Sequence, residues 1–170
     1  MKKLHLGCGK DYLQDFINVD FCSGCKADLY CDLSRLPLPF KDNEVDYVYA
    51  KHFLSYIPDV YKWLNDLHRI CKDGATVRFV MPHFSSTNVW TDMGHHRGFS
   101  TSSFDCDMFR QFTNSGFRVV FQRLTFPTQR FFMRYLANRF KGFYDHNLAY
   151  TFPANELIVE LKVYKQQEKV

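Results

Sequence analysis

The sequence contains no apolar run long enough to cross a membrane and no segment that resembles a secretory signal peptide. Lys2 and Lys3 precede only a few apolar residues before Gly7, which is too short for the apolar core of such a signal. Internal repeats, low-complexity tracts and linkers rich in Pro, Gly and Ser are also absent. These absences exclude a membrane-spanning or repeat protein and predict a cytoplasmic one.

Charge of one sign is also scarce, because the net charge is only +4 over 170 residues. This balance permits a nucleic-acid partner without favouring one, since nucleic-acid binders usually concentrate more charge on one face. The length suffices for one domain with a hydrophobic core, so residues 1–170 are predicted to form a single domain. The expected compartment is reducing, so the six cysteines are predicted to be free thiols. They are Cys8, Cys22, Cys25, Cys31, Cys71 and Cys106.

Short apolar runs, rich in β-branched and aromatic residues, alternate with turn residues along the chain. Their length and composition predict strands. The runs cover residues 3–6, 17–20, 27–31, 45–50, 75–81, 117–126 and 157–164.

Two helical patterns separate the later strands. Asp59 is placed as an N-cap before apolar residues at spacings of three and four, and Gly74 is predicted to end this helix. Ser102 and Asp105 resemble a capping box that opens a second helix, which ends at residues 114–116. The alternation of strands and helices predicts an α/β fold with a mainly parallel sheet. Only seven residues separate Gly9 from Ile17, so the first crossover helix is expected to be shortened to about a turn.

Glycine and acidic residues follow the first three predicted strands. In an open parallel sheet, ligands bind at the carboxyl ends of the strands. Gly7 and Gly9 allow backbone N–H groups to approach a ligand closely. Asp20 ends the second strand, where a carboxylate can accept hydrogen bonds from ribose hydroxyls, and Asp32 follows the third. A nicotinamide dinucleotide fits poorly, because its fingerprint needs a third glycine where this sequence has Tyr12.

These residues resemble the class I S-adenosylmethionine (SAM)-dependent methyltransferases of the small single-domain type. The matching motifs are Leu-Gly-Cys-Gly at 6–9, Asn-Val-Asp at 18–20, Asp-Leu at 32–33, Leu-Pro-Phe at 38–40, Asp-Tyr-Val-Tyr at 46–49 and the helix end at 69–74. The resemblance implies a Rossmann-like methyltransferase fold, with seven strands, an antiparallel last strand and shortened N-terminal helices. It also implies SAM as the cofactor and S-adenosylhomocysteine as its product.

The resemblance also implies roles for single residues. Those implied to bind the cofactor are Gly7, Cys8 and Gly9 at the methionine part, Asp20 at the ribose, Asp32 and Leu33 at the adenine, and Ala50 and Lys51 at the end of strand four. Two departures stand out: the connection after Gly9 is short, and Phe-Leu-Ser-Tyr at 53–56 replaces the Leu-Glu-His of close relatives.

Histidines follow the fourth and fifth strands, where an acceptor and a general base would lie. His83 and His96 are the candidate catalytic residues. Candidate substrate residues are His52, Trp90, Asp92, His95 and Arg97. No metal site is predicted, because Cys22, Cys25 and Cys31 lack a fourth zinc ligand.

Residues 127–156 form an aromatic and basic insertion between the last two strands. Phe132, Leu136 and Phe140 recur every fourth residue, opposite a polar face that carries Arg130, Arg134, Asn138 and Lys141. This pattern predicts one amphipathic helix that ends near Gly142. Four interpretations of the insertion stay open: a helix packed on the domain, a lid over the acceptor, a dimer surface, or a patch for an anionic ligand.

The sequence therefore favours a SAM-dependent methyltransferase that acts on a small-molecule or sugar-like acceptor at oxygen. Two alternatives stay open: an RNA methyltransferase, and a non-catalytic SAM-binding or interaction protein. A homodimer is also left open.

Overall fold

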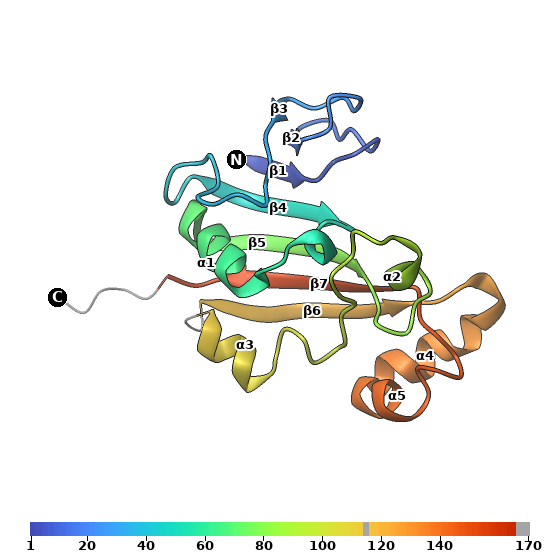
Figure 1. Ribbon diagram of the computed structural model, residues 1–170. Helices are drawn as coiled ribbons and strands as arrows, with labels where there is room; N and C mark the ends of the chain where they lie inside the picture. Colours follow the sequence, from blue (N-terminus) through green and yellow to red (C-terminus); the bar gives the residue numbers. More distant parts are fainter. Residues whose placement is uncertain (114–115, 166–170) are drawn as a thin grey trace.

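The computed structural model describes residues 1–113 and 116–165, and its centre is one seven-stranded sheet (Figure 1). The strands are β1 (Lys3–Leu6), β2 (Ile17–Asp20), β3 (Leu29–Tyr30), β4 (Val45–Lys51), β5 (Cys71–Pro82), β6 (Phe117–Thr125) and β7 (Glu156–Val163). Their order is β3-β2-β1-β4-β5-β7-β6, with β1 to β5 parallel and β7 antiparallel to both neighbours. The predicted α/β fold with an antiparallel last strand is confirmed. The carboxyl ends of the parallel strands share one edge, on the right in Figure 1.

Short helices connect the strands after β4. They are η1 (Leu54–Tyr56), α1 (Val60–Ile70), α2 (Asn88–Thr91), α3 (Asp107–Phe112), η2 (Thr128–Arg130), α4 (Phe131–Arg139) and α5 (Lys141–Asn147). As predicted, Asp59 caps α1, because its carboxylate accepts a hydrogen bond from the backbone N–H of Lys62 at 3.0 Å. α1 and α3 both cover the face of the sheet that is turned to the viewer in Figure 1. None of the described helices is long and apolar enough to cross a bilayer.

The connection between β1 and β2 contains no helix, whereas the short spacing predicts a helix of about one turn. Along β4, Val48 is buried on the side of α1, whereas Tyr47 and Tyr49 are on the opposite face. There, side chains take the place of a helix: the ring of His5 packs against Tyr49 at 5.1 Å between centroids, and Phe16 against Tyr47 at 5.9 Å. The first half of the chain is therefore stabilised by strand pairing and aromatic contacts.

Two predicted helix boundaries are wrong. α1 ends at Ile70, four residues before Gly74, because the chain enters β5 at Cys71 and Gly74 adopts its positive φ of 72° within that strand. Residues 101–105 form turns, and α3 begins only after Cys106, whose sulfur accepts a hydrogen bond from the N–H of Phe109. The predicted end of that helix falls partly on residues 114–115, outside the described residues.

The insertion between β6 and β7 forms two helices, and the prediction of one helix ending near Gly142 is wrong. The chain leaves helical geometry at Phe140, where φ is −128° and ψ is 60°, and α5 then continues through Gly142. Asn138 anchors α4 to β6, since its amide accepts a hydrogen bond from the N–H of Leu124 and donates one to its carbonyl. The result is a helical hairpin, called here the α4–α5 hairpin, beside the carboxyl end of β6 (Figure 1).

Trp63 links α1 to the segment after β3. Its side chain is 1% exposed, and its indole N–H donates a hydrogen bond to the carbonyl oxygen of Leu33 at 2.9 Å. A buried carbonyl without a partner is costly, so this bond holds Leu33 against the helix.

Replacing Trp63 with Phe removes this donor and leaves the Leu33 carbonyl unsatisfied. We expect the free energy of unfolding to fall by at least about 1–3 kcal/mol, measured by urea denaturation. The same substitution at Trp90, whose side chain is 78% exposed, is the matched control and should leave the midpoint almost unchanged. Equal midpoints for the two variants would show that the indole bond does not stabilise the fold.

Candidate functional site

A cavity of about 650 Å³ opens at the carboxyl edge of the sheet, beside β1, β2 and β4. Its lining residues come from the connections that follow these strands and β3. They are Gly7, Gly9, Asp20, Phe21, Cys31, Asp32, Leu33, Ser34, Lys51, His52, Phe53, Tyr56 and Ile57. The volume lies within the range of small-molecule sites, about 300–1,000 Å³.

One wall of the cavity is the turn after β1. Gly7 and Gly9 have positive φ angles of 65° and 53°, a conformation that glycine adopts without strain. Glycine is also required at position 7 by space, since a Cβ there would lie 2.5 Å from Cδ2 of Phe53. The carboxylate of Asp20 closes this wall: its two oxygens accept hydrogen bonds from the N–H of Gly9 at 2.8 Å and of Cys22 at 2.9 Å.

The opposite wall follows β3. The carboxylate of Asp32 accepts hydrogen bonds from the hydroxyl and the backbone N–H of Ser34, and a further one from Arg35. These bonds to Ser34, aided by Arg35, hold the pKa of Asp32 below its ordinary value. Leu33 is 3% exposed and its carbonyl is held by Trp63. This wall thus combines a fixed backbone with an ionised carboxylate.

His52 lies at the third side of the cavity, directly after β4. It has a positive φ of 55°, uncommon for a residue with a side chain and often found at functional sites. Its Nε2 is 2.8 Å from Oε1 of Glu156, the first residue of β7. The hydrogen bond with His52 holds the pKa of Glu156 below its ordinary value, although burial opposes this. A histidine paired with a carboxylate therefore borders the cavity.

Six of the eight residues predicted to bind the cofactor line this cavity: Gly7, Gly9, Asp20, Asp32, Leu33 and Lys51. Cys8 and Ala50 are not among the lining residues; they are 3% and 1% exposed and belong to the packed interior. Sequence reasoning missed Phe21, Cys31, Ser34, Phe53, Tyr56 and Ile57. Only the departure noted at residues 53–56 pointed towards any of them.

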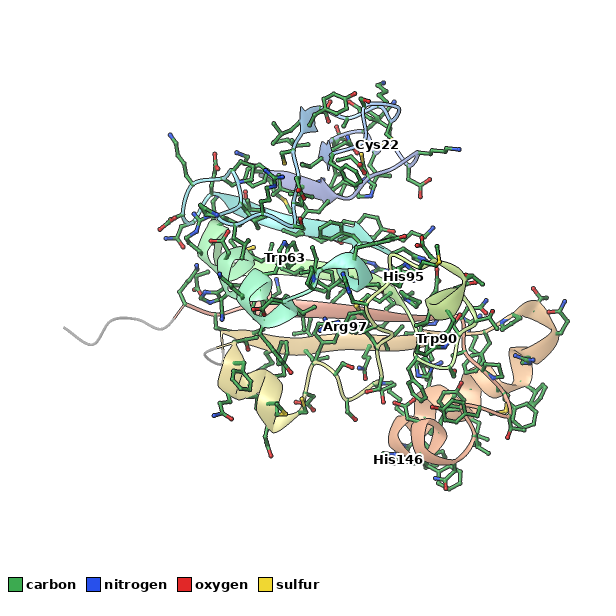
Figure 2. All side chains as sticks on the ribbon, in the orientation of Figure 1. Cys22, Trp63, Trp90, His95, Arg97 and His146 are labelled. Atoms are coloured by element: carbon green, nitrogen blue, oxygen red, sulfur yellow. The ribbon has the colours of Figure 1, made fainter. Side chains whose placement is uncertain are left out.

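The loop after β5 does not supply the predicted substrate residues to the cavity. Among those residues, only His52 is part of the lining. Asp92 accepts a hydrogen bond from the hydroxyl of Tyr56 at 2.5 Å, and the ring of His95 packs on Tyr56 at 4.6 Å between centroids. Trp90 and Arg97 lie on the same connection (Figure 2). This loop therefore supports Tyr56, which is one of the residues that line the cavity.

Arg97 and His96 attach the loop to the segment around η1. The guanidinium of Arg97 donates a hydrogen bond to the carbonyl of Pro58, and the backbone N–H of His96 donates one to the carbonyl of Ser55. The ring of His96 is exposed and outside the cavity lining. The geometry gives no support to the predicted catalytic role of His96.

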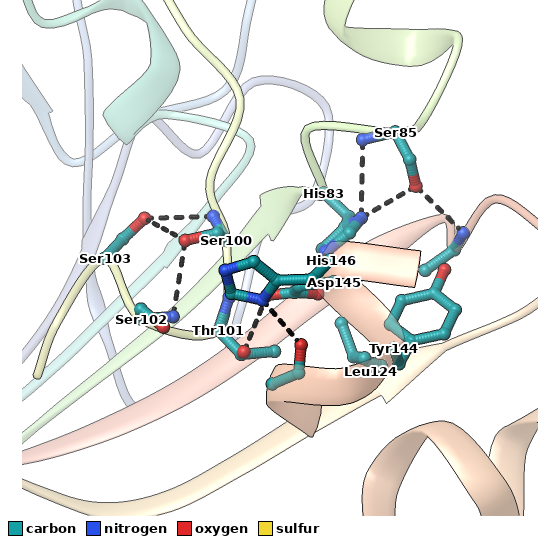
Figure 3. Close-up of polar contacts among 12 residues, drawn as sticks. His83, Ser85, Ser100, Thr101, Ser102, Ser103, Leu124, Tyr144, Asp145 and His146 are labelled. Carbon is teal, nitrogen blue, oxygen red and sulfur yellow. Dashed lines mark hydrogen bonds and ion pairs between the residues drawn. The ribbon is translucent and has the colours of Figure 1, made fainter. Parts of the chain in front are cut away.

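His83 also lies away from the cavity, in a buried polar cluster (Figure 3). Its side chain has no exposed surface; Nε2 is 3.0 Å from Oδ1 of Asp145 and Nδ1 is 2.8 Å from Oγ of Ser85. The N–H and hydroxyl of Thr101 donate to the other oxygen of Asp145. A Ser-His-Asp contact of this kind needs an accessible imidazole for catalysis, so this geometry gives no support to the predicted catalytic role of His83.

The cluster instead clamps the α4–α5 hairpin to the end of β5. Burial raises the pKa of Asp145, but the hydrogen bonds from His83 and Thr101 outweigh it and hold this pKa below its ordinary value. When Nε2–H of His83 donates to Asp145, the hydroxyl of Ser85 lies within hydrogen-bond distance of Nδ1. The side chains of His83, Asp145 and Thr101 thus satisfy one another inside the protein.

Metal ligands do not gather anywhere in residues 1–113 or 116–165: no three His, Cys, Asp or Glu side chains there are placed to hold an ion. All six cysteines are free thiols, including Cys22, Cys25 and Cys31, which the sequence analysis considered as zinc ligands.

Comparisons with known proteins agree with this architecture. A family model described as a methyltransferase domain matches residues 25–79. A SAM-dependent methyltransferase from Archaeoglobus fulgidus superposes with a TM-score of 0.68 at 16% identity, covering 95% of this chain and 85% of that one. One from Mesorhizobium loti gives 0.61 at 15% identity, with 95% and 90% covered. The YcgJ protein from Bacillus subtilis gives 0.62 at 16%, with 98% and 92% covered. The sequence matches no curated protein.

The chain has the class I methyltransferase fold. The solved structures establish the fold, and the family model, which includes the Asp-Leu motif at 32–33, agrees with the resemblance seen in the sequence. The methyltransferase-domain model over residues 25–79 agrees with the predicted enzyme class, a SAM-dependent methyltransferase with SAM as cofactor. The acceptor and the residues that act on it are not fixed by these likenesses.

Asp145→Ala leaves the donors of His83 and Thr101 buried without an acceptor. We expect a loss of at least about 1–3 kcal/mol at pH 7, and a smaller loss for Asp145→Asn, which keeps one acceptor oxygen. Because the folded state lowers the pKa of Asp145, its contribution is present above the ordinary value of 3.8 and lost as pH falls through the lower folded value. The gap between wild type and Asp145→Ala should therefore narrow in strong acid.

Urea denaturation at pH 7 and at a series of acidic pH values measures this gap. Asp107→Ala, which removes a fully exposed carboxylate on α3, serves as the control and should leave the midpoint unchanged. A gap that widens in acid would contradict the assignment of an ionised Asp145.

Proposed function

We propose that this methyltransferase acts on the hydroxyl group of a small-molecule or sugar-like acceptor, with His52 as the general base. The observation that carries the proposal is the His52–Glu156 pair at the border of the cavity. An alcohol is a weak nucleophile, so its transfer reaction gains from a base that removes the hydroxyl proton. Histidine is suited to this task near neutral pH.

The residues of the cavity fit the cofactor. Asp20 would accept hydrogen bonds from the ribose hydroxyls, since each carboxylate oxygen has acceptor capacity beyond the single bond it now makes. Gly7 and Gly9 would let the methionine part lie close to the backbone. Leu33 and Ile57 offer apolar surface to the adenine ring, with Asp32 beside it.

SAM supplies an activated methyl group together with its leaving group, so the protein mainly aligns the acceptor and removes a proton. When Nε2–H of His52 donates to Glu156, Nδ1 is the nitrogen that is free to take the hydroxyl proton. The ionised Glu156 then stabilises the imidazolium that forms. Thr125, whose hydroxyl is 3.4 Å from Oε2 of Glu156, helps to orient this carboxylate.

SAM and S-adenosylhomocysteine should each stabilise the protein thermally, whereas NAD should not. A ligand at about 100 times its dissociation constant contributes about 2.7 kcal/mol, which corresponds to a shift of several degrees. Asp20→Asn should weaken binding about tenfold or more in calorimetric titration. Asp15→Asn, on the exposed turn of the same connection, is the control. Unchanged affinity in Asp20→Asn would refute the assignment of the ribose site.

His52→Gln should lower kcat by about 10²–10⁴ towards a hydroxyl acceptor, while the affinity for SAM changes little. Glu156→Gln should lower kcat less, since His52 keeps a hydrogen-bond partner. His96→Gln is the matched control and should keep wild-type kcat. Equal losses in His52→Gln and His96→Gln would sink the proposal.

A further inference from the structure

The α4–α5 hairpin exposes a row of apolar side chains, called here the apolar stripe: Phe132, Leu136, Phe140 and Phe143. Each is between 39% and 59% exposed. Phe132 and Leu136 are four residues apart and share one side of α4, Phe140 follows at the end of this helix, and Phe143 lies on α5. Met133 and Ala137 of the same helix are buried. Contiguous apolar surface of this kind on a protein marks an interaction site.

A second feature of α4 is a basic groove between this helix and β6. The groove has a volume of about 490 Å³ and is lined by Phe121, Gln122, Arg123, Arg134, Tyr135, Asn138 and Arg139. It contains three arginines and no carboxylate. In the described part of the chain, none of these arginines forms an ion pair with a carboxylate. The groove is therefore complementary to an anion.

The charge of the surrounding sequence strengthens this argument. Residues 108–144 contain seven Lys or Arg and no Asp or Glu, whereas the whole chain has a net charge of only +4. The rest of the chain is therefore net acidic, and positive charge is concentrated on α3, β6 and the hairpin. The net charge of the whole chain is therefore modest, although its positive and negative charges are unevenly distributed along the sequence.

We propose that the α4–α5 hairpin docks on an anionic phospholipid surface. The apolar stripe enters the boundary between headgroups and acyl chains, while Arg134 and Arg139 in the groove, with Arg123, bind headgroup phosphates. Interfacial helices combine these same two features, apolar side chains on one face and basic residues on the polar face that meets the headgroups. The hairpin needs no membrane-spanning length for this, and the inference does not depend on the acceptor proposed above.

Two other occupants explain less of the structure. Single-stranded RNA would account for the arginines and for stacking on Tyr135, but it leaves Phe and Leu side chains without polar atoms in water. A second copy of the chain would bury the stripe. In a symmetric dimer, however, the same basic surface approaches itself, and like charges repel. An anionic lipid surface is the one partner that suits both the stripe and the groove.

Flotation of the full chain with vesicles tests the proposal. The protein should float with vesicles of phosphatidylcholine containing about a third phosphatidylglycerol, and about tenfold less with pure phosphatidylcholine. Raising the salt concentration should weaken binding to the anionic vesicles, because exposed charges are screened.

Three double variants separate the apolar and the electrostatic contributions. Phe140→Ser with Phe143→Ser, and Arg134→Ala with Arg139→Ala, should each reduce partitioning at least about tenfold. Phe140→Leu with Phe143→Leu should retain it, which separates lost apolar contact from a local change of fold. Met93→Ser, at a side chain that is 99% exposed on another loop, and Lys62→Ala on α1 are the controls and should bind like wild type. Thermal unfolding checks that each variant is folded.

Three outcomes would overturn the proposal. The first is failure of the folded wild type to float with anionic vesicles. The second is tight, salt-sensitive binding of a short single-stranded RNA that the arginine variant loses, with no partitioning onto lipid. The third is a concentration-dependent dimer in sedimentation that the serine variant abolishes, again without lipid binding.

Discussion

The carboxylate of Asp20 is the interaction on which the candidate site depends. The connection between β1 and β2 has no helix, so hydrogen bonds hold the glycine turn in place. The N–H groups of Gly7 and Cys8 donate to the carbonyl of Val19, and Asp20 accepts the N–H groups of Gly9 and Cys22. The turn then leaves room for Phe53 against Gly7, and Phe53 in turn packs on Trp63 with ring centroids 5.5 Å apart. One buried carboxylate thus links the cofactor wall to the core helix α1.

The sheet could be predicted from the sequence, because every strand is a short apolar run that ends in turn residues. The cofactor side of the site followed too, since glycines and carboxylates at strand ends are local signals that the parallel topology brings to one edge. The helix boundaries at Gly74 and Gly142 could not be predicted. At Gly74 the chain had already entered β5, and at Gly142 helical geometry resumed after Phe140, so tertiary packing decided both.

The histidines show where sequence reasoning ends. His83 and His52 both follow parallel strands, and nothing local distinguishes them. Their partners do: His83 meets Asp145, which is 62 residues away, in a site without solvent, whereas His52 meets Glu156 across 104 residues at the border of a cavity. Asp145 lies on α5 within the insertion, and Glu156 is where the insertion returns to the sheet as β7. The hydrophobic periodicity of the sequence does not predict the path that the insertion takes between them. Long-range contacts therefore separate a structural clamp from a candidate base.

The insertion connects these observations, because it enters after Thr125 and returns at Glu156. These two residues pair across β6 and β7, so the hairpin stands directly on the strand ends that carry the proposed base and its orienting hydroxyl. The clamp of His83 and Asp145 fixes the hairpin to β5 from the other side. A surface that binds the stripe and the groove would then sit beside the acceptor side of the cavity. The proposed docking surface and the proposed base would then lie at the same edge of the sheet, and the buried hydrogen bond between His83 and Asp145 would fix the hairpin there.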